Sequence, residues 1–175
     1  IWKIKDKLQL CKVGLDPTGL DLLDEDDLVR LRREVKEAGP ERLFYIADAF
    51  RAGMSVEEVY GLSFVDPWFL DQIEEIVEAE VDIAQRGLDG LDGKRLRGLK
   101  RMGFSDARIA QLTGTNETAV RALRKAFGVR PVYKRVDSCA GEFATQTAYL
   151  YSTYEDECEA EPTDRRKIMV LGGGP

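Results

Sequence analysis

Apolar residues recur at helical spacing through most of the first 130 residues, in stretches bounded by capping residues and glycines. Leu28, Leu31 and Val35 form one such apolar stripe. Asp24 has the residue type of a helix N-cap ahead of an acidic first turn, and Gly39 has that of a helix stop. The pattern predicts a helix between these two residues.

The same start and stop signals recur further along the chain. Pro40 suits the first turn of a helix, Ser55 and Glu58 have the spacing of a capping box, and Asp66 with Pro67 opens a long helix. These signals predict six further helices. The first ends at Gly53, the second starts at Ser55, and the third runs from Pro67 to Gly87. The fourth occupies 92–102 ahead of Gly103, the fifth starts at Ser105, and the sixth runs from Asn116 or Thr115 to Gly128.

The chain aligns with itself, without a gap, when it is shifted by 50 residues. Gly-Met-Ser at 53–55 faces Gly-Phe-Ser at 103–105, and Asp66 faces Asn116. A unit of this size buries its apolar faces poorly alone, whereas two packed units bury them well. We interpret the match as an internal duplication; the alternative is that helical hairpins share caps by chance. The paired apolar positions are Val59 with Ile109, Leu62 with Leu112, Leu70 with Val120 and Ile73 with Leu123.

Beyond Pro131 the helical pattern ends, and tyrosines and β-branched residues appear before an acidic stretch, YEDECEAEPTD. We expect an extended, partly irregular segment there, with 137–166 poorly ordered or packed against another copy. The final KIMVLGGGP has the pattern of a strand and a glycine turn. The expected fold is all-α with two similar multihelical subdomains, divided into an N-terminal segment 1–23, a helical domain 24–130 (subdomains 24–88 and 89–130), an extended segment 131–166, and a strand stub with its glycine loop, 167–175.

Composition limits the chemistry that the chain can carry. Its 175 residues are 43% apolar and 33% charged, as in a soluble globular protein, and no apolar stretch reaches the roughly 18 residues that span a membrane. The absence of histidine removes the commonest general base and metal ligand at neutral pH. Cys11, Cys139 and Cys158 are far apart and odd in number, which disfavours a disulfide framework and a zinc site. No signal peptide is evident, and we expect a reducing compartment, the cytoplasm.

Charge is unevenly distributed along a chain whose formal net charge is −6. Residues 94–135 carry twelve Lys and Arg against two acids, a net charge of +10. Within them, GFSDARIAQLTGTNETAVRALRKAFG has the pattern of a helix-turn-helix whose second helix carries Arg121, Arg124 and Lys125, so a DNA-binding domain is one hypothesis. Against it, Glu117 starts the reading helix, and the same motif recurs earlier on an acidic background. Docking on an acidic protein surface is the alternative.

Two further patterns have simpler explanations than chemistry. Glu74 and Glu78 have the spacing of paired acids on a helix, but the row Glu74, Glu75, Glu78 and Glu80 is typical of the solvated face of a long helix. The terminal LGGGP would suit a phosphate-binding turn only if a helix followed it. We therefore expect no catalytic, cofactor-binding or metal-binding residue in this chain.

Four stretches carry a more specific pattern: RLFYIADAFRAGMSVEEVYGLSFVDPWFLDQIEEIVEAE, LKRMGFSDARIAQLTG, PVYKRVDSCAGEFATQTAYLYSTYEDECE and KIMVLGGGP. Together, over roughly residues 24–175, they resemble the middle of the large subunit of carbamoyl-phosphate synthetases. VYKRVDSCAGEFAT is the most specific part, because neither periodicity nor capping explains it. Ser138 and Gly141 stand there where family members often have Thr and Ala.

The resemblance implies a helical oligomerisation, or connection, domain of two similar subdomains, which in that family joins two homologous ATP-grasp halves, together with the first strand of the second half. The whole enzyme would make carbamoyl phosphate from bicarbonate, glutamine-derived ammonia and two MgATP, for pyrimidine and arginine synthesis, with Mg²⁺ or Mn²⁺. The family's catalytic residues lie in the ATP-grasp halves, so none is carried over and this chain alone would not be an enzyme. The implied partners are the other domains of the large subunit, a glutaminase small subunit and further copies, without nucleic acid or membrane.

Large apolar side chains near turns are the candidates for self-association, because a small domain leaves some of them uncovered. We expect this interface at Met54, Phe64, Trp68 and Phe104.

Overall fold

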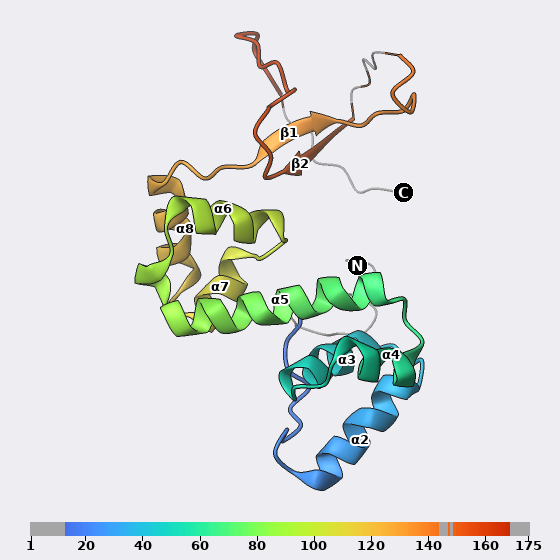
Figure 1. The fold of residues 1–175 in the computed structure, drawn as a ribbon. Helices are drawn as coiled ribbons and strands as arrows, with labels where there is room; N and C mark the ends of the chain where they lie inside the picture. Colours follow the sequence, from blue (N-terminus) through green and yellow to red (C-terminus); the bar gives the residue numbers. More distant parts are fainter. Residues whose placement is uncertain (1–12, 144–146, 148, 169–175) are drawn as a thin grey trace. The chain divides into compact units, whose positions relative to one another are not determined.

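A computed structural model describes residues 13–143, 147 and 149–168 (Figure 1). The chain divides into two compact units, Ile1–Val129 and Arg130–Pro175. Over the described residues the fold is mostly helical, with seven α-helices in the first unit and a two-stranded antiparallel hairpin in the second.

The helices begin and end close to the predicted positions. The first of them ends at Lys36, three residues before Gly39, because Glu37 already has an extended backbone (φ −81°, ψ 129°). In chain order the helices are α2 (Glu25–Lys36), α3 (Arg42–Arg51), α4 (Val56–Ser63), α5 (Pro67–Arg86), the 3₁₀ turn η1 (Leu88–Gly90), α6 (Gly93–Arg101), α7 (Asp106–Leu112) and α8 (Glu117–Ala126).

Side-chain caps start most of these helices, as their sequences predict. Ser55 Oγ accepts from the N–H of Glu58 at 3.3 Å, and the Glu58 carboxylate accepts from the N–H of Ser55 at 2.8 Å, so the expected capping box is present. At the start of α5, the Asp66 carboxylate accepts from the N–H of Trp68 at 2.9 Å, with Pro67 in the first turn. These bonds satisfy amide groups that have no partner within the helix.

The order of caps returns 50 residues later. Ser105 and Asn116 cap α7 and α8, as Ser55 and Asp66 cap α4 and α5. The cap of α8 is therefore Asn116 and not Thr115, the other residue that the sequence allowed. α3, α4 and the start of α5 thus correspond in chain position to α6, α7 and α8.

A shared glycine turn buries two of the residues that we expected at an interface. Gly53 and Gly103 close α3 and α6 with φ of 83° and 95°, and the N–H of the next residue donates to a carbonyl five residues back, at 3.0 Å in both turns. This motif folds the residue after the glycine back onto its own helix. Met54 and Phe104 are that residue and are 8% and 6% exposed, so the expectation that they lie uncovered is wrong.

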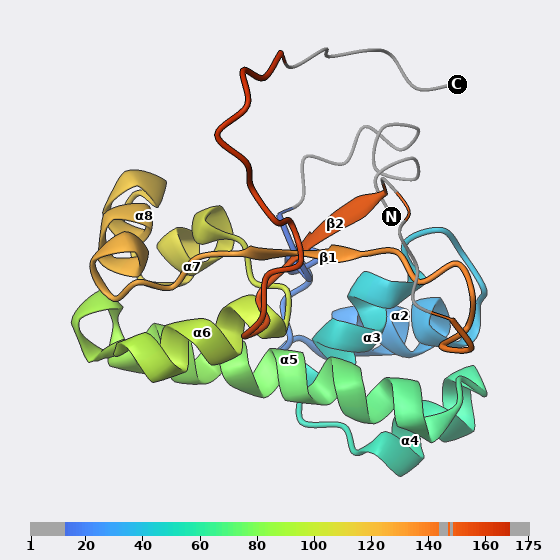
Figure 2. The same cartoon turned by 90° about the horizontal axis from the view of Figure 1, so that it is seen from above.

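The apolar interior lies along α5, the longest helix (Figures 1 and 2). α2, α3 and α4 lie beside its N-terminal half, and α6, α7 and α8 lie toward its C-terminal half. The first core is built from Leu31, Val35, Tyr45, Ile46, Ala47, Ala49, Phe50, Met54, Val59, Leu70 and Val77. The buried apolar residues around α6–α8 are Leu91, Leu96, Leu99, Phe104, Ile109, Ala110, Val120 and Val129.

The second unit contains a β-hairpin where only an extended, partly irregular segment was expected. β1 (Val132–Arg135) pairs antiparallel with β2 (Leu150–Thr153), and Tyr133 lies opposite Ser152. β-Branched and aromatic residues favour strands, which accounts for pairing in this tyrosine-containing stretch. The chain is therefore not purely all-α. Of the expected final strand, 167–175, only residues 167 and 168 are described, so that strand stays a prediction, as does the packing of 137–166 against another copy.

Glu159 forms hydrogen bonds to β1 of the hairpin. Its N–H donates to the carbonyl of Tyr133 at 2.7 Å, and its carboxylate accepts from the N–H of Arg135 at 2.7 Å and from Lys134 Nζ at 3.1 Å. The N–H of Arg135, followed by the Lys134 ammonium, holds the pKa of the Glu159 carboxyl below its usual value of 4.5. Two strands alone are marginally stable, so this third segment contributes to holding them together.

The capping box of α4 yields a stability prediction. Ser55→Ala removes the hydroxyl that accepts from Glu58, and we expect it to lower the free energy of unfolding by about 1 kcal/mol. Gly61→Ala should raise it by about 0.5–1 kcal/mol, because Gly61 lies inside α4 and an added Cβ meets no atom within 4 Å. Urea unfolding followed by circular dichroism measures both changes. Equal stability of the two variants would contradict this assignment of the helix.

Candidate functional site

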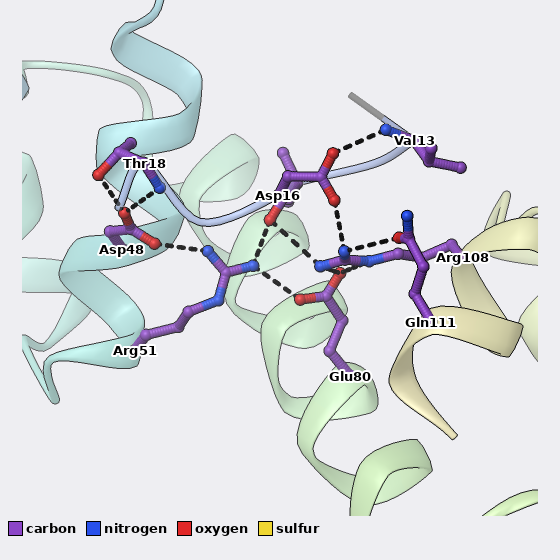
Figure 3. A network of polar contacts seen from close by, with 9 residues as sticks. Val13, Asp16, Thr18, Asp48, Arg51, Glu80, Arg108 and Gln111 are labelled. Carbon is purple, nitrogen blue, oxygen red and sulfur yellow. Dashed lines mark hydrogen bonds and ion pairs between the residues drawn. The ribbon is translucent and has the colours of Figure 1, made fainter. Parts of the chain in front are cut away.

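A network of charged and polar side chains joins four parts of the first unit (Figure 3). The contributing parts are the segment before α2, and the helices α3, α5 and α7. α3 belongs to the first set of corresponding helices and α7 to the second, and α5, whose first turns belong to the first set, runs along both. This network, called the joint below, consists of Asp16, Thr18, Asp48, Arg51, Glu80 and Arg108.

Glu80, on α5, is the centre of the joint. It is 5% exposed, and its two carboxylate oxygens bind one arginine each. Oε2 accepts from Arg51 Nη2 of α3 at 2.7 Å. Oε1 accepts from Arg108 Nε of α7 at 2.8 Å and lies 2.7 Å from Arg108 Nη2. One buried carboxylate therefore ties together helices from both halves of the unit.

Arg51 continues the network toward the start of the chain. Its Nη1 donates to Asp48 Oδ1 at 2.7 Å, and its Nη2 also donates to the carbonyl of Leu15. Asp48 is 1% exposed, and its other oxygen accepts from the N–H of Thr18 at 2.8 Å and from the Thr18 hydroxyl at 2.6 Å. The segment before α2 is thereby fixed to α3.

Arg108 closes the network from the opposite side. It is 6% exposed, and its Nη1 donates to Asp16 and, at 3.3 Å, to Gln111 Oε1. The other oxygen of Asp16 accepts from the N–H of Val13 at 2.7 Å. The same N-terminal segment thus contacts an arginine of α7 and, through Thr18, a carboxylate of α3.

The joint contains three carboxylates and two guanidinium groups, and all of its polar groups have partners. In the described part of the chain, no buried side-chain nitrogen or oxygen lacks a hydrogen-bond partner. Burying charges costs several kcal/mol per ion, and geometry of this quality offsets that cost. Removing one partner is strongly destabilising, because it leaves the remaining charge buried. What the joint provides is therefore one defined arrangement of the two halves, since each helix must present its charge at one position.

The joint corrects our interpretation of Glu80. We placed Glu80 with Glu74, Glu75 and Glu78 on a solvated helix face, but Glu80 is buried. The signal that could have identified it is its position three residues after Val77 and three before Ile83, on the apolar stripe of α5. A buried acid on such a stripe needs a cationic partner, and Arg51 and Arg108, both distant from it in the sequence, supply it.

A second buried carboxylate, Asp106, organises the helices α6–α8. It is 8% exposed and binds Lys100 Nζ at 2.9 Å and Arg124 Nη2 at 3.0 Å. Burial acts to raise the pKa of Asp106, but hydrogen bonds from Lys100 and Arg124 outweigh it, so the pKa lies below its usual 3.8. The residues 50 positions before Lys100, Asp106 and Arg124 are Phe50, Val56 and Glu74. The corresponding location in the first set of helices is therefore stabilised without these ion pairs.

Much of the basic segment is paired within the chain. On α8, Arg124 binds Asp106, and Arg121 forms an ion pair with Glu117. Arg108 is buried in the joint, and Arg95 Nη2 lies 2.7 Å from Asp82. The charge of these side chains is neutralised by neighbouring carboxylates, so the structure gives the DNA-binding hypothesis little support.

Phe64 and Trp68, the other two interface candidates, are exposed as expected. Their exposed fractions are 77% and 61%, and they lie at the end of α4 and in the first turn of α5. Tyr60 and Phe69, which we did not expect at an interface, are 43% and 56% exposed and contact Phe64 and Trp68. The structure thus brings four aromatic residues together at the α4–α5 turn and removes Met54 and Phe104 from the exposed surface.

The described residues contain neither a metal cluster nor a membrane-spanning helix. Within that part of the chain, no three His, Cys, Asp or Glu side chains form a group that could hold a metal ion. No helix there is both long and apolar enough to cross a membrane. Cys139 and Cys158 are free, and Cys11 lies outside the described residues.

Comparison with known proteins identifies the helical region. Residues 6–128 match the family described as the carbamoyl-phosphate synthetase large chain, oligomerisation domain. The chain is 74% identical over 168 residues to the carbamoyl phosphate synthase large chain of Xylella fastidiosa (strain 9a5c), and 72% to that of Xanthomonas axonopodis pv. citri. Identity to the large chain of Vibrio cholerae is 55%. Each match covers 96% of this chain but only 16% of the relative's length.

The joint predicts a large difference between two neighbouring glutamates of α5. Glu80→Gln preserves shape but leaves Arg51 and Arg108 without their shared carboxylate, and should lower the free energy of unfolding by about 3 kcal/mol. Glu78→Gln, on the exposed side of α5, should change it by less than about 0.5 kcal/mol. Denaturant unfolding of both variants tests this; a Glu80→Gln change no larger than that of Glu78→Gln would contradict the joint.

The lowered pKa of Asp106 predicts a pH dependence. Because the folded-state value lies below 3.8, the stabilisation from ionised Asp106 is complete well above that pH and is lost as the pH falls through the folded-state value. The difference in unfolding free energy between the natural chain and Asp106→Asn should be constant above about pH 5 and shrink below 3.8. Unfolding curves from pH 7 downward measure it, and a difference that grows on acidification would show the opposite sign.

Proposed function

This chain belongs to the family of oligomerisation domains of the carbamoyl-phosphate synthetase large chain, and from that premise we propose that it is a rigid, non-catalytic connector. It spans 16% of the length of the curated relatives that it matches. In our proposal, a longer large chain makes carbamoyl phosphate from bicarbonate, glutamine-derived ammonia and two MgATP, and this region holds its two ATP-grasp halves in one orientation. ATP and Mg²⁺ or Mn²⁺ belong to those halves, and a glutaminase subunit supplies the ammonia.

The joint is the observation that carries this proposal. A connector transmits a fixed orientation only if its own two halves cannot rotate against each other. Glu80 binds an arginine of α3 and an arginine of α7, and Asp16 adds a second contact to α7 from the segment before α2. Buried, fully paired charges tolerate little rearrangement, because any displacement leaves one of them unpaired in an apolar surrounding.

The domain division and the duplication are part of the same proposal. Subdomains 24–88 and 89–130 would derive from one ancestral helical unit, which the recurrence of caps and glycine turns at a 50-residue offset supports. Residues 131–166 would run from this domain toward the next, with 167–175 as the first strand of that next domain. The cytoplasm is the compartment in which we expect the enzyme to act.

A mild change in the joint of the full-length large chain tests the connector role. Arg51→Lys keeps the positive charge but loses the planar fork that spans Asp48, Glu80 and the Leu15 carbonyl. We expect ATP hydrolysis to persist while carbamoyl phosphate formed per ATP consumed falls several-fold, because the two halves no longer keep their orientation. Arg33→Lys, at an exposed position of α2, should leave this ratio unchanged.

The ratio must be measured on chains that remain folded, which circular dichroism of each variant establishes. An unchanged ratio for folded Arg51→Lys would contradict the connector role. A fall in ATP hydrolysis of the same size as the fall in synthesis would also contradict it, because that result indicates general loss of active protein.

A further inference from the structure

Residues 13–18, called the strap below, form a second bridge between α3 and α7, in addition to the buried carboxylate of α5 (Figure 3). At α3, Asp48 accepts twice from Thr18, from its N–H at 2.8 Å and from its hydroxyl at 2.6 Å. At α7, Arg108 Nη1 donates to the Asp16 carboxylate. Two positions of one short segment therefore anchor it to helices from both halves of the unit.

The backbone of the strap covers both arginines of the joint. The Leu15 carbonyl accepts from Arg51 Nη2 and, at 3.5 Å, from Arg108 Nη2. A Cβ added at Gly14 would lie 3.5–3.6 Å from three atoms of the Arg108 side chain, so the backbone passes directly over that side chain. Arg108 is 6% exposed in this arrangement, and removal of the strap would open one side of its guanidinium group to water.

The strap contributes one charge to the joint, the carboxylate of Asp16. Without it, the two carboxylates of α3 and α5 still balance the two guanidinium groups. The Asp16 side chain is also 20% exposed, whereas the side chains of Asp48 and Glu80 are 2% and 6% exposed. Release of the strap therefore leaves no net charge in the apolar interior, and water can solvate the nitrogen of Arg108 that Asp16 had bound.

The local structure of the strap favours its movement as one piece. None of residues 13–18 is fully buried, and Leu15 is the half-buried side chain that packs against the first core. Pro17 lies between the two anchoring residues and restricts the backbone there, so the anchors move together. Gly19 follows the strap with φ of 90°, a conformation that suits a hinge. Segments with few buried apolar contacts open locally at low free energy.

Two bridges hold the two halves in a narrower range of orientations than one bridge does. With the strap docked, α3 and α7 are joined both through Glu80 and through the strap. With the strap released, Glu80 still binds one arginine of each helix and keeps their average arrangement. Rotation about this single carboxylate then becomes possible, because no second contact fixes the angle between the halves.

We propose that the strap is removable and that its docking switches the first unit between a rigid and a hinged arrangement. This inference rests on the proposed function and deepens it by naming how the connector is regulated. In that function, the preceding half of a longer large chain joins this region upstream of the strap. Displacement of that half pulls on the strap, and release of the strap loosens the orientation that the connector otherwise keeps constant.

Hydrogen exchange of Asp16→Asn tests whether the strap opens as one piece. The substitution removes the charge that binds Arg108 and leaves the bonds between Thr18 and Asp48 in place. We expect the Thr18 amide to exchange at least about tenfold faster, while the slowest amides of α3 change far less. Asp71→Asn, at an exposed position of α5, is the matched control and should change neither. Two-dimensional NMR in D₂O measures these rates.

Chemical modification of arginine tests whether the strap covers the joint. With butanedione and mapping by mass spectrometry, Arg108 should react at least about tenfold faster in Asp16→Asn than in the natural chain. Arg124 is the internal reference, because its side chain is 12% exposed and binds Asp106 in the same set of helices, away from the strap. An equal rise at both arginines would indicate general loosening of the helices and would overturn the inference, as would no rise at Arg108.

The distance between the two halves measures the switch itself. With one spin label on α2 and one on α8, pulsed electron resonance should give a wider distance distribution for Asp16→Asn than for the natural chain. Its centre should stay at the same distance, because Glu80 still joins the two arginines. Asp71→Asn should leave both the width and the centre unchanged. An unchanged width in an Asp16→Asn chain whose strap exchanges faster would show that the strap does not control the orientation.

The outcomes separate this inference from the proposed function. Unchanged exchange at Thr18 and unchanged modification of Arg108 in folded Asp16→Asn would overturn the strap, and would leave the contacts of Glu80 and the connector role intact. The connector role has its own readout, the yield of carbamoyl phosphate per ATP in the full-length chain. Failure of that readout would remove the role of the strap in an enzyme, while its opening and closing would still be measured by exchange and modification.

Discussion

The arrangement of the helices in the first unit depends on Glu80, whose carboxylate binds two arginines. Its carboxylate is almost completely buried and binds Arg51 of α3 and Arg108 of α7. Each arginine binds only one of the two carboxylate oxygens, so movement of either helix would leave one oxygen without its partner. The position of the second set of helices relative to the first is therefore set by one ionised side chain on the helix that they share.

An apolar contact of similar area would hold the two halves together less specifically. Hydrophobic attraction is non-directional, so helices that pack only through aliphatic side chains have several arrangements of similar energy. Buried charges remove these alternatives, because each displaced arrangement exposes an unpaired ion to an apolar surrounding. The large desolvation cost is consistent with a role in geometry more than in stability. This distinction matters for the proposed connector role, which depends on a constant orientation.

Local signals in the sequence predicted the helices, and long-range contacts explain what they could not predict. The capping box at Ser55 and the Asp66 cap depend on residues two or three positions apart, so they can be recognised from the sequence alone. The joint pairs Asp16 with Arg108 across 92 residues, and no local pattern identifies which acid meets which base. Met54 was misplaced for a related reason: its position beside a turn indicated exposure, but the glycine turn folds it inward. The hairpin pairs Tyr133 with Ser152 across a long stretch of sequence, and no local pattern identifies that pairing.

The distance between the two halves, measured in solution, tests the central claim most directly. Spin labels at Arg30→Cys on α2 and Ala122→Cys on α8, with the three native cysteines changed to Ser, report that distance by pulsed electron resonance in samples diluted with unlabelled chain. We predict one narrow distance distribution for the natural joint and for Glu78→Gln, and a broad or shifted one for Glu80→Gln under conditions where its helices remain folded. A distribution equally narrow and centred at the same distance in folded Glu80→Gln would contradict the account, because the orientation would then be fixed by packing without the buried charges.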